Sequence, residues 1–120
     1  MINRFAGASI WTEDLTRLLP FYRDVLGLKV NMEAPGYVML GGGSADSPAL
    51  ALAAHSQVHG PNQDPNRHMV ALVSDDIRGD VQRLKAAGVE FVSEPEDMGG
   101  VLLATLKDPD GNLVQLFEYK

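Results

Sequence analysis

The sequence predicts an α+β fold made of two copies of one βαβββ unit. Two observations predict it: the order strand, helix, strand, strand, strand occurs twice, and the aspartate and glycine that bound the first helix recur 61 residues later, as Asp75 and Gly88. A polar segment containing glycine and prolines separates the copies. We therefore expect a single domain over residues 1–120, with module one at 1–54, a linker at 55–66 and module two at 67–120.

The composition is that of a soluble globular protein. Of the 120 residues 45% are apolar, and the formal net charge of −6 disfavours nucleic acid and anionic membrane surfaces as partners. No run of 18 apolar residues predicts a membrane span. The absence of cysteine excludes disulfides, thiolate metal sites and a cysteine nucleophile. Because the first residues lead directly into a strand-like pattern, we expect no secretory signal and a cytoplasmic location.

The first module begins with a predicted strand at residues 4–12. The helix that follows is predicted to begin at the capping residue Asp14 and to end at Gly27, with Pro20 causing a bend or a 3₁₀ turn. Its apolar side chains recur at helical spacing: Leu15, Leu18, Leu19, Tyr22, Val25 and Leu26. Three strands are then expected at residues 28–33, 37–40 and 49–53, with turns at Pro35-Gly36 and Gly41-Gly42-Gly43.

The second module repeats this order, beginning with a strand at residues 67–74. Asp75 or Asp76 caps a helix whose apolar side carries Ile77, Val81 and Leu84 and which Gly88 closes. The last three strands are predicted at residues 89–93, 101–107 and 113–119, with a turn at 108–112. Because each unit leaves one sheet face uncovered by its helix, we expect the two units to form a curled half-barrel with a central cleft.

Four stretches of the chain are similar to the vicinal oxygen chelate superfamily, which includes glyoxalase I, the bleomycin-resistance proteins and the extradiol dioxygenases. They are Ile-Trp-Thr-Glu-Asp-Leu at 10–15, Pro-Phe-Tyr-Arg-Asp-Val-Leu-Gly-Leu at 20–28, His-Met-Val-Ala-Leu-Val-Ser-Asp-Asp-Ile at 68–77, and Asp-Pro-Asp-Gly-Asn-Leu-Val-Gln-Leu at 108–116. The resemblance implies a glyoxalase-like fold. It does not select a reaction, because the superfamily contains lyases, epimerases, dioxygenases, thiol transferases and non-catalytic drug binders.

The resemblance also implies four positions for a divalent metal, one on the first and one on the last strand of each module. They correspond to Gly7, a position within 49–53, His68 and Gln115. Glycine and the alanine–leucine stretch at 49–53 offer no donor atom, which leaves two neutral ligands. We therefore expect no catalytic metal and no cofactor; a divalent metal held through His68 and Gln115 is the alternative.

Other polar groups have simpler interpretations. His55 and His59 are four residues apart, but they are interpreted as solvated linker residues rather than a metal pair. Asp108 and Asp110 lack the twelve-residue spacing of a calcium loop, and a turn accounts for both.

Strand alternation, combined with the resemblance, predicts which side chains line the cleft. The predicted catalytic candidates are His68 and Gln115, and the predicted ligand-binding residues are Ser9, Trp11, Met39, Val70, Leu72, Leu113 and Phe117. Such a lining suits a flat or partly apolar ligand held by a few hydrogen bonds. An alternative role for Trp11 is packing in the core or at a dimer interface. An alternative role for Gln115 is simply to form a hydrogen bond with His68.

The predicted function is a metal-free protein that binds a small organic molecule, an antibiotic or a metabolite, as a homodimer. The alternative is a lyase, isomerase or epimerase in which His68 is the general acid or base and Gln115 orients it or binds an oxyanion. A third interpretation is a paralogue whose cleft has lost its role.

Overall fold

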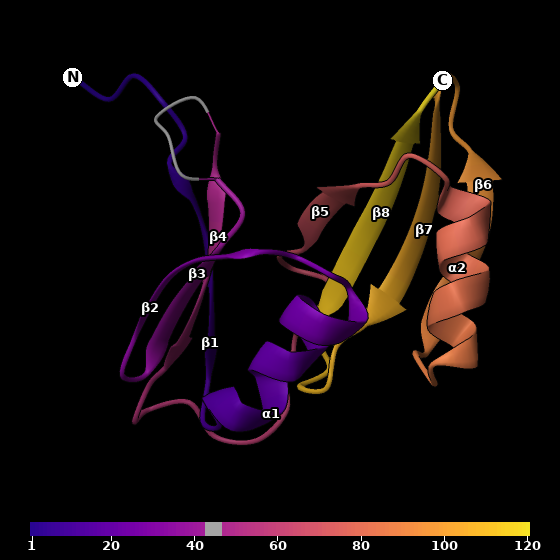
Figure 1. The fold of residues 1–120 in the computed structure, drawn as a ribbon. Helices are drawn as coiled ribbons and strands as arrows, with labels where there is room; N and C mark the ends of the chain where they lie inside the picture. The colour runs from indigo at the N-terminus through magenta and orange to yellow at the C-terminus, as the bar shows by residue number, and fades with distance from the viewer. Residues whose placement is uncertain (43–46) are drawn as a thin grey trace. The chain divides into compact units, whose positions relative to one another are not determined.

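The computed structural model describes residues 1–42 and 47–120, which fall into two compact units, Met1–Gly60 and Pro61–Lys120 (Figure 1). Unit 1 contains β1 (Gly7–Thr12), α1 (Leu15–Pro20), the π-helical turn η1 (Phe21–Val25), β2 (Val30–Ala34), β3 (Tyr37–Leu40) and β4 (Ala49–Ala54). Unit 2 contains β5 (Val70–Val73), α2 (Ile77–Ala86), β6 (Phe91–Asp97), β7 (Val101–Lys107) and β8 (Leu113–Tyr119). The predicted βαβββ order is confirmed in both units.

The two sheets have the same topology. Sheet 1 has the strand order β1-β4-β3-β2 and sheet 2 has the order β5-β8-β7-β6. In each, the first strand pairs in parallel with the last, and the other neighbours are antiparallel. Two halves that share such an arrangement support the internal duplication predicted from the sequence.

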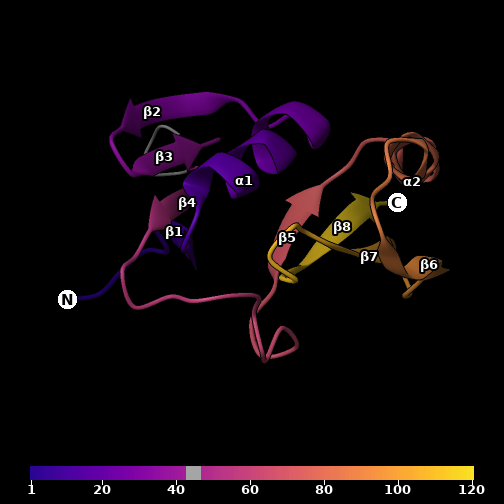
Figure 2. The same ribbon diagram turned by 90° about the horizontal axis from the view of Figure 1, so that it is seen from below.

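Each unit has its own apolar core between its helix and one face of its sheet. In unit 1 the apolar sheet residues buried on the helix side are Ile10, Val38, Leu40, Leu50 and Leu52, and the helical segment buries Leu18, Leu19, Phe21 and Tyr22. On the other face of this sheet the small side chains of Ala51 and Ala53 are also buried. In unit 2 the sheet buries Leu102, Ala104, Leu106, Val114 and Leu116, and α2 buries the three predicted residues Ile77, Val81 and Leu84. Figure 2 shows α2 beside sheet 2, where it packs against β6, β7 and β8.

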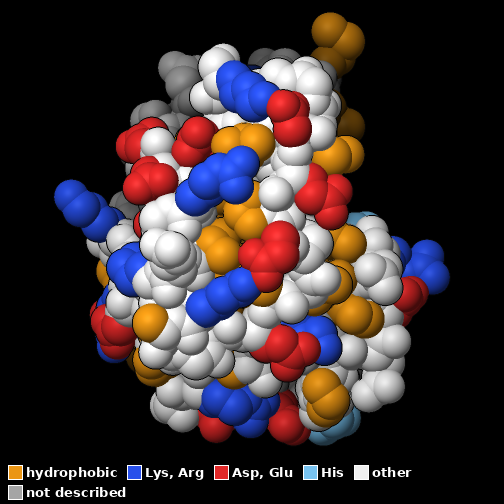
Figure 3. Space-filling view, turned by 90° about the vertical axis from the view of Figure 1, so that its right-hand side faces the viewer, with side chains coloured by type: hydrophobic (Ala, Val, Ile, Leu, Met, Phe, Trp, Pro, Cys, Tyr) orange, Lys and Arg blue, Asp and Glu red, His pale blue; other side chains and the backbone are white. Residues whose placement is uncertain are grey.

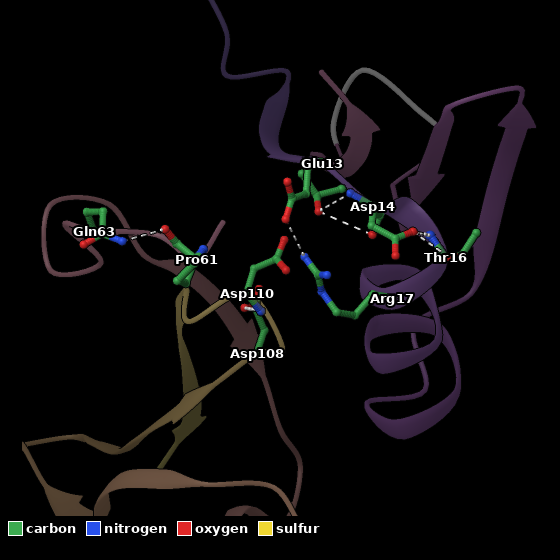
Figure 4. Close-up of polar contacts among 9 residues, drawn as sticks. Glu13, Asp14, Thr16, Arg17, Pro61, Gln63, Asp108 and Asp110 are labelled. Atoms are coloured by element: carbon green, nitrogen blue, oxygen red, sulfur yellow. Dashed lines mark hydrogen bonds and ion pairs between the residues drawn. The ribbon is translucent and has the colours of Figure 1, made fainter. Parts of the chain in front are cut away.

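The first helix begins where the sequence predicts. Asp14 is the N-cap of α1, and its carboxylate accepts hydrogen bonds from the backbone N–H and the hydroxyl of Thr16 (Figure 4). The hydroxyl of Thr16 is the main cause that lowers the pKa of Asp14 below its ordinary value. Glu13 and Arg17 form an ion pair of 3.8 Å on the exposed side of the same turn.

The second helix begins at Asp76, which decides between the two predicted caps. Its side chain accepts from the Gly79 backbone N–H at 3.1 Å. The offset of 61 residues therefore does not relate the two caps, although it does relate Gly27 and Gly88, which both have positive φ. From cap to glycine, the helical segment of unit 1 is one residue longer than that of unit 2.

A π-helical turn accommodates this extra residue. Instead of the bend or 3₁₀ turn predicted at Pro20, α1 ends at Pro20 and η1 follows, with the Leu26 N–H donating to the carbonyl of Phe21 at 2.9 Å. A π-turn is closed by hydrogen bonds five residues apart, so it holds one residue more than an α-helical turn. Phe21 and Tyr22, the first residues of this turn, are buried in the core of unit 1.

The predicted strand boundaries differ most from the structure at β6, which covers Phe91–Asp97 instead of 89–93. The predicted ranges 37–40, 101–107 and 113–119 agree with the structure, whereas β5 covers Val70–Val73 instead of 67–74. The other strand ends shift by at most three residues, and Gly43 of the predicted glycine turn lies outside the described residues. No helix in residues 1–42 and 47–120 is both long and apolar enough to cross a membrane.

Ion pairs characterise the outer side of α2 and β6. Figure 3 views the molecule from this side and shows acidic and basic side chains interspersed, with apolar side chains between them. The pairs include Lys85–Glu94, from α2 to β6, and Arg83–Asp80 within α2. Such a mixed charged surface is typical of a solvated helix face.

Candidate functional site

The open face of sheet 1, the face opposite its buried core, carries the predicted site residues of unit 1. Along β1 the buried Ile10 and Thr12 alternate with Ser9 and Trp11, which are exposed. The register aligns Ser9 with Ala51 and Met39, and Trp11 with Ala53 and Tyr37. Ser9, Trp11 and Met39 therefore lie on one face, and Tyr37 joins them.

Two rows of side chains cross this open face of sheet 1. One row contains Trp11, Ala53 and Tyr37, and the other contains Ser9, Ala51, Met39 and Met32. The central strand β4 contributes only a methyl group to each row. Trp11 and Tyr37 are two strand spacings apart, about 10 Å between their backbones. The face therefore presents aromatic and thioether side chains on both sides of a small central residue.

Trp11 is the largest apolar side chain of the open face, and its side chain is 48% exposed. It contacts His55, with the two ring centroids 5.5 Å apart and the rings nearly perpendicular, at 89°. His55 follows β4 directly, and its backbone N–H donates to the carbonyl of Thr12 at 3.0 Å. His55 was interpreted as a solvated linker residue; the structure places it against the Trp11 end of the open face of sheet 1.

In unit 2, Gln115 and Phe117 lie on the open face of sheet 2, the face away from α2. Gln115 is opposite Thr105, and Phe117 is opposite Leu103, on the neighbouring strand β7. Leu113 shares this side of β8 by alternation and is buried. The rings of Phe117 and Tyr119 make an edge contact, with their centroids 6.4 Å apart. The predicted residues of β8 therefore share one face.

The predicted residues of β5 do not share that face. Val70 pairs with Val114 and Leu72 with Leu116, whereas Gln115 pairs with Ala71. Aligned residues of neighbouring strands project to the same side, so Val70 and Leu72 lie on the side of sheet 2 that α2 covers. On that same side the Glu118 carboxylate accepts from the first backbone N–H of α2, at Ile77, at 2.8 Å. The prediction that Val70 and Leu72 line a site together with Gln115 was wrong.

His68 lies before β5 rather than on it, and it is exposed. Among the hydrogen bonds of the described residues none joins His68 to Gln115. The predicted orientation of His68 by Gln115, and the alternative that Gln115 simply pairs with His68, therefore have no hydrogen bond to support them. The physical reason is the short β5: Arg67, His68 and Met69 form no ladder that would fix the side-chain direction.

Gly7 corresponds to the first metal position implied by the resemblance. A Cβ atom built on Gly7 would lie 2.1 Å from the carbonyl oxygen of Ala49, its partner in the parallel pair. Real Cβ atoms do not approach an oxygen this closely, because the optimal separation of nonbonded heavy atoms is about 3.5 Å or more. A ligating side chain therefore does not fit at position 7 while β1 and β4 remain paired as they are.

The remaining metal positions supply too few donors. β4 contains only alanine and leucine, so unit 1 offers no ligand at either position. In unit 2, His68 and Gln115 are both neutral, and they come from a loop and a strand respectively. Within residues 1–42 and 47–120 no group of three or more His, Cys, Asp or Glu side chains is arranged to hold a metal ion. The residues present do not fit the four-ligand site.

The comparisons with known proteins agree with this fold. Residues 2–116 match the family model of the Glyoxalase/Bleomycin resistance protein/Dioxygenase superfamily. The uncharacterized protein YurT of Bacillus subtilis is 28% identical, with 92% of this chain and 94% of that protein covered. Among solved structures, the hypothetical protein SA1046 of S. aureus is 26% identical, with a TM-score of 0.73 and 98% and 94% of the two chains covered. The trypanothione-dependent glyoxalase I of Leishmania major is 25% identical, with a TM-score of 0.75 and 98% and 87% covered.

Proposed function

Because the chain belongs to the Glyoxalase/Bleomycin resistance protein/Dioxygenase superfamily, we propose that it binds a small, flat organic molecule on the open face of sheet 1 without a catalytic metal. The observation that carries this proposal is Trp11, which stands 48% exposed on the same face as Tyr37, with only the methyl group of Ala53 between them. A tryptophan that remains half exposed beside a row of apolar side chains is typical of a ligand or partner surface.

The side chains of this face favour a flat, partly apolar ligand. Stacking of aromatic rings contributes about 0.5–1.5 kcal/mol beyond the burial of apolar area. Met39 and Met32 add flexible thioethers, which adapt to ligands of different outline. The exposed hydrogen-bonding groups of β1 on this face are the Ser9 hydroxyl and the Trp11 indole N–H, so the open face of sheet 1 offers few polar contacts and a large apolar contact area.

Metal independence is the second part of the proposal. It is supported by the clash that any side chain at Gly7 would make and by the lack of donors on β4. We further propose that the protein acts in the cytoplasm and that it is a homodimer. Light scattering coupled to size-exclusion chromatography tests the homodimer directly.

The test uses Trp11, the single tryptophan of the chain, as its reporter. We expect its emission to change when the neutral aromatic probe N-phenyl-1-naphthylamine is added, with saturation and with the same affinity in EDTA. The metal-free glycopeptide bleomycin serves as a second probe, since the superfamily includes bleomycin-resistance proteins. Saturable binding of either probe in EDTA supports the proposal; no binding of either, or binding that requires a metal, contradicts it.

A matched pair of variants locates the site. Ala53→Leu places a larger side chain between Trp11 and Tyr37 and is expected to weaken probe binding at least tenfold. Ala86→Leu makes the same addition at an exposed position of α2 in unit 2, and binding should stay within twofold. Circular dichroism verifies that both variants are folded.

The competing prediction is an enzyme of lyase, isomerase or epimerase type that uses His68 as acid or base. The exposed position of His68 outside β5 favours the binding protein over this enzyme. In a binding protein His68→Ala leaves the affinity for N-phenyl-1-naphthylamine within twofold. The enzyme is favoured if the wild type converts methylglyoxal and glutathione to a thioester and His68→Ala does not.

A further inference from the structure

We propose that His55 belongs to the binding site on the open face of sheet 1 and donates a hydrogen bond from Nε2 to the ligand. The preferred ligands are therefore aromatic molecules that carry an oxygen acceptor. This inference rests on the proposed function and names the ligand class of the same site.

The first step is the position of His55. Its backbone N–H donates to the Thr12 carbonyl at 3.0 Å, which continues the pairing of β4 with β1 by one residue beyond Ala54. The ring then lies 5.5 Å from the Trp11 ring, centroid to centroid, in an edge-on arrangement. A ligand that stacks on Trp11 consequently brings its substituents within reach of the imidazole.

The second step is the tautomer of the ring. The Gln57 backbone N–H donates to Nδ1 of His55 at 3.0 Å, so Nδ1 carries the lone pair. In a neutral imidazole only one nitrogen carries a proton, and with Nδ1 accepting, that proton is on Nε2. His55 therefore presents a hydrogen-bond donor, with its acceptor nitrogen already occupied by its own chain.

The Nε2–H donor of His55 is available to a ligand. His55 is exposed, and among the described residues no hydrogen bond to its Nε2 is present. The donor is also held in place, because the backbone bond to Thr12 and the bond from Gln57 restrict the main chain and the ring. A donor fixed before the ligand arrives favours an acceptor at one position of the ligand and thus gives selectivity.

The consequence is a selectivity between ligands that differ in one group. A flat hydrocarbon uses the apolar rows of the open face alone. A flat molecule with a sulfonate, carboxylate, phenolate or carbonyl oxygen beside its ring gains the bond to Nε2, and a hydrogen bond to a charged group is among the stronger ones in proteins.

The experiment uses two probes that share one skeleton. N-phenyl-1-naphthylamine is neutral, and 8-anilino-1-naphthalenesulfonate is the same molecule with a sulfonate. Affinities are measured by titration of the Trp11 emission in EDTA. We expect His55→Phe, which keeps a ring against Trp11 but removes the donor, to weaken the sulfonate probe about tenfold and the neutral probe less than twofold.

Two further variants complete the set. His59→Phe, an exposed histidine of the same segment, should leave both affinities unchanged. His55→Gln supplies an amide donor and should recover part of the affinity for the sulfonate. Independently of any ligand, two-bond ¹H–¹⁵N correlation spectra of the histidine rings should show His55 with its proton on Nε2.

The outcomes separate the two proposals. If neither probe binds to the wild type, the proposed function is contradicted and this inference falls with it. If both probes bind but His55→Phe weakens them equally, or affects neither, the site stands and the role of His55 as a donor is refuted. A proton on Nδ1 in the spectra would refute the donor role as well.

Discussion

Substitutions of Gly7 test whether the backbone of β4 leaves room for a metal-binding side chain at this position of β1. In Gly7→Ala the new Cβ would lie 2.1 Å from the Ala49 carbonyl oxygen and 3.1 Å from two further backbone atoms of Ala49. To reach an ordinary contact of about 3.5 Å, β1 and β4 must separate locally by roughly 1.4 Å. This separation stretches the hydrogen bond from the Ala49 N–H to the Ala6 carbonyl, which is already 3.2 Å long.

The magnitude follows from these two effects. A lost backbone hydrogen bond costs about 1 kcal/mol, and overpacking of a close contact costs about 1–3 kcal/mol more. Beyond the backbone penalty that any side chain meets at a positive φ, we therefore expect the free energy of unfolding to fall by about 3 kcal/mol, which lowers the melting temperature of a chain of this size by about 10 °C. Gly7→His should destabilise at least as much, and it should not bind Zn²⁺ even though it adds a third donor to His68 and Gln115.

The assays are urea denaturation followed by circular dichroism, and isothermal titration with Zn²⁺. Gly88→Ala is the matched control: Gly88 also has positive φ but nothing lies within 4 Å of its Cβ position. It should cost only the left-handed backbone penalty, about 1–2 kcal/mol. The reasoning is refuted if Gly7→Ala costs no more than Gly88→Ala, or if Gly7→His binds one Zn²⁺ per chain.

Three further substitutions test the local structure. Gly79→Ala would bring its Cβ to 2.3 Å from Asp76 Oδ2 and so weaken the N-cap of α2. This loss should cancel the gain of about 1 kcal/mol that Gly→Ala usually gives in a helix, so the free energy of unfolding in urea denaturation should hardly change. A full gain would show that the cap is unimportant. The Asp108 carboxylate accepts hydrogen bonds from the backbone N–H groups of Asp110 and Asn112 and from the side-chain amide of Asn112. Asp108→Ala removes this acceptor and should lower the free energy of unfolding by about 3 kcal/mol, against about 1 kcal/mol for Asp108→Asn. Equal losses in the two variants would contradict this account. Because the folded pKa of Asp14 is lowered, Asp14 stabilises the fold above its unfolded pKa of 3.8, and this contribution is lost as the pH falls through the folded pKa. Thr16→Val should raise the pKa of Asp14 in a carboxyl NMR titration. An unchanged pKa would exclude the Thr16 hydroxyl as the cause of the lowered pKa.

The architecture was predictable because local signals agree with one another. The caps, the closing glycines and the apolar periodicity of Ile77, Val81 and Leu84 all specify the same helices, and alternation specifies β7 and β8. The π-turn at Phe21–Val25 was not predictable from periodicity, since it shows only as one extra residue between cap and glycine. That extra residue, visible when Asp76 rather than Asp75 is aligned with Asp14, is the signal that was available.

Which predicted residues share a sheet face was predictable where the strand is continuous through them. For Ser9 and Trp11 the shared face follows from alternation along the continuous strand β1. For Met39 the sequence left two registers open, and the pairing of β3 with β4 places both Met39 and Tyr37 on that face. For Val70 and Leu72 the prediction extended the alternation from His68, across residues that form no strand. In the parallel pairing of β5 with β8 it is Ala71, not Val70 or Leu72, that aligns with Gln115, so the predicted register was off by one residue. His55 was missed because its contact with Trp11 depends on the parallel pairing of β1 with β4, which links positions far apart in sequence.

The most direct test of metal-free binding on the open face of sheet 1 is a ¹H–¹⁵N correlation titration with N-phenyl-1-naphthylamine in EDTA. We predict shifts of the single indole resonance, from Trp11, and of the backbone amides of Ser9, Tyr37 and Met39. Shifts that require added Zn²⁺ and centre on His68 and Gln115, with the Trp11 indole unmoved, would contradict the account.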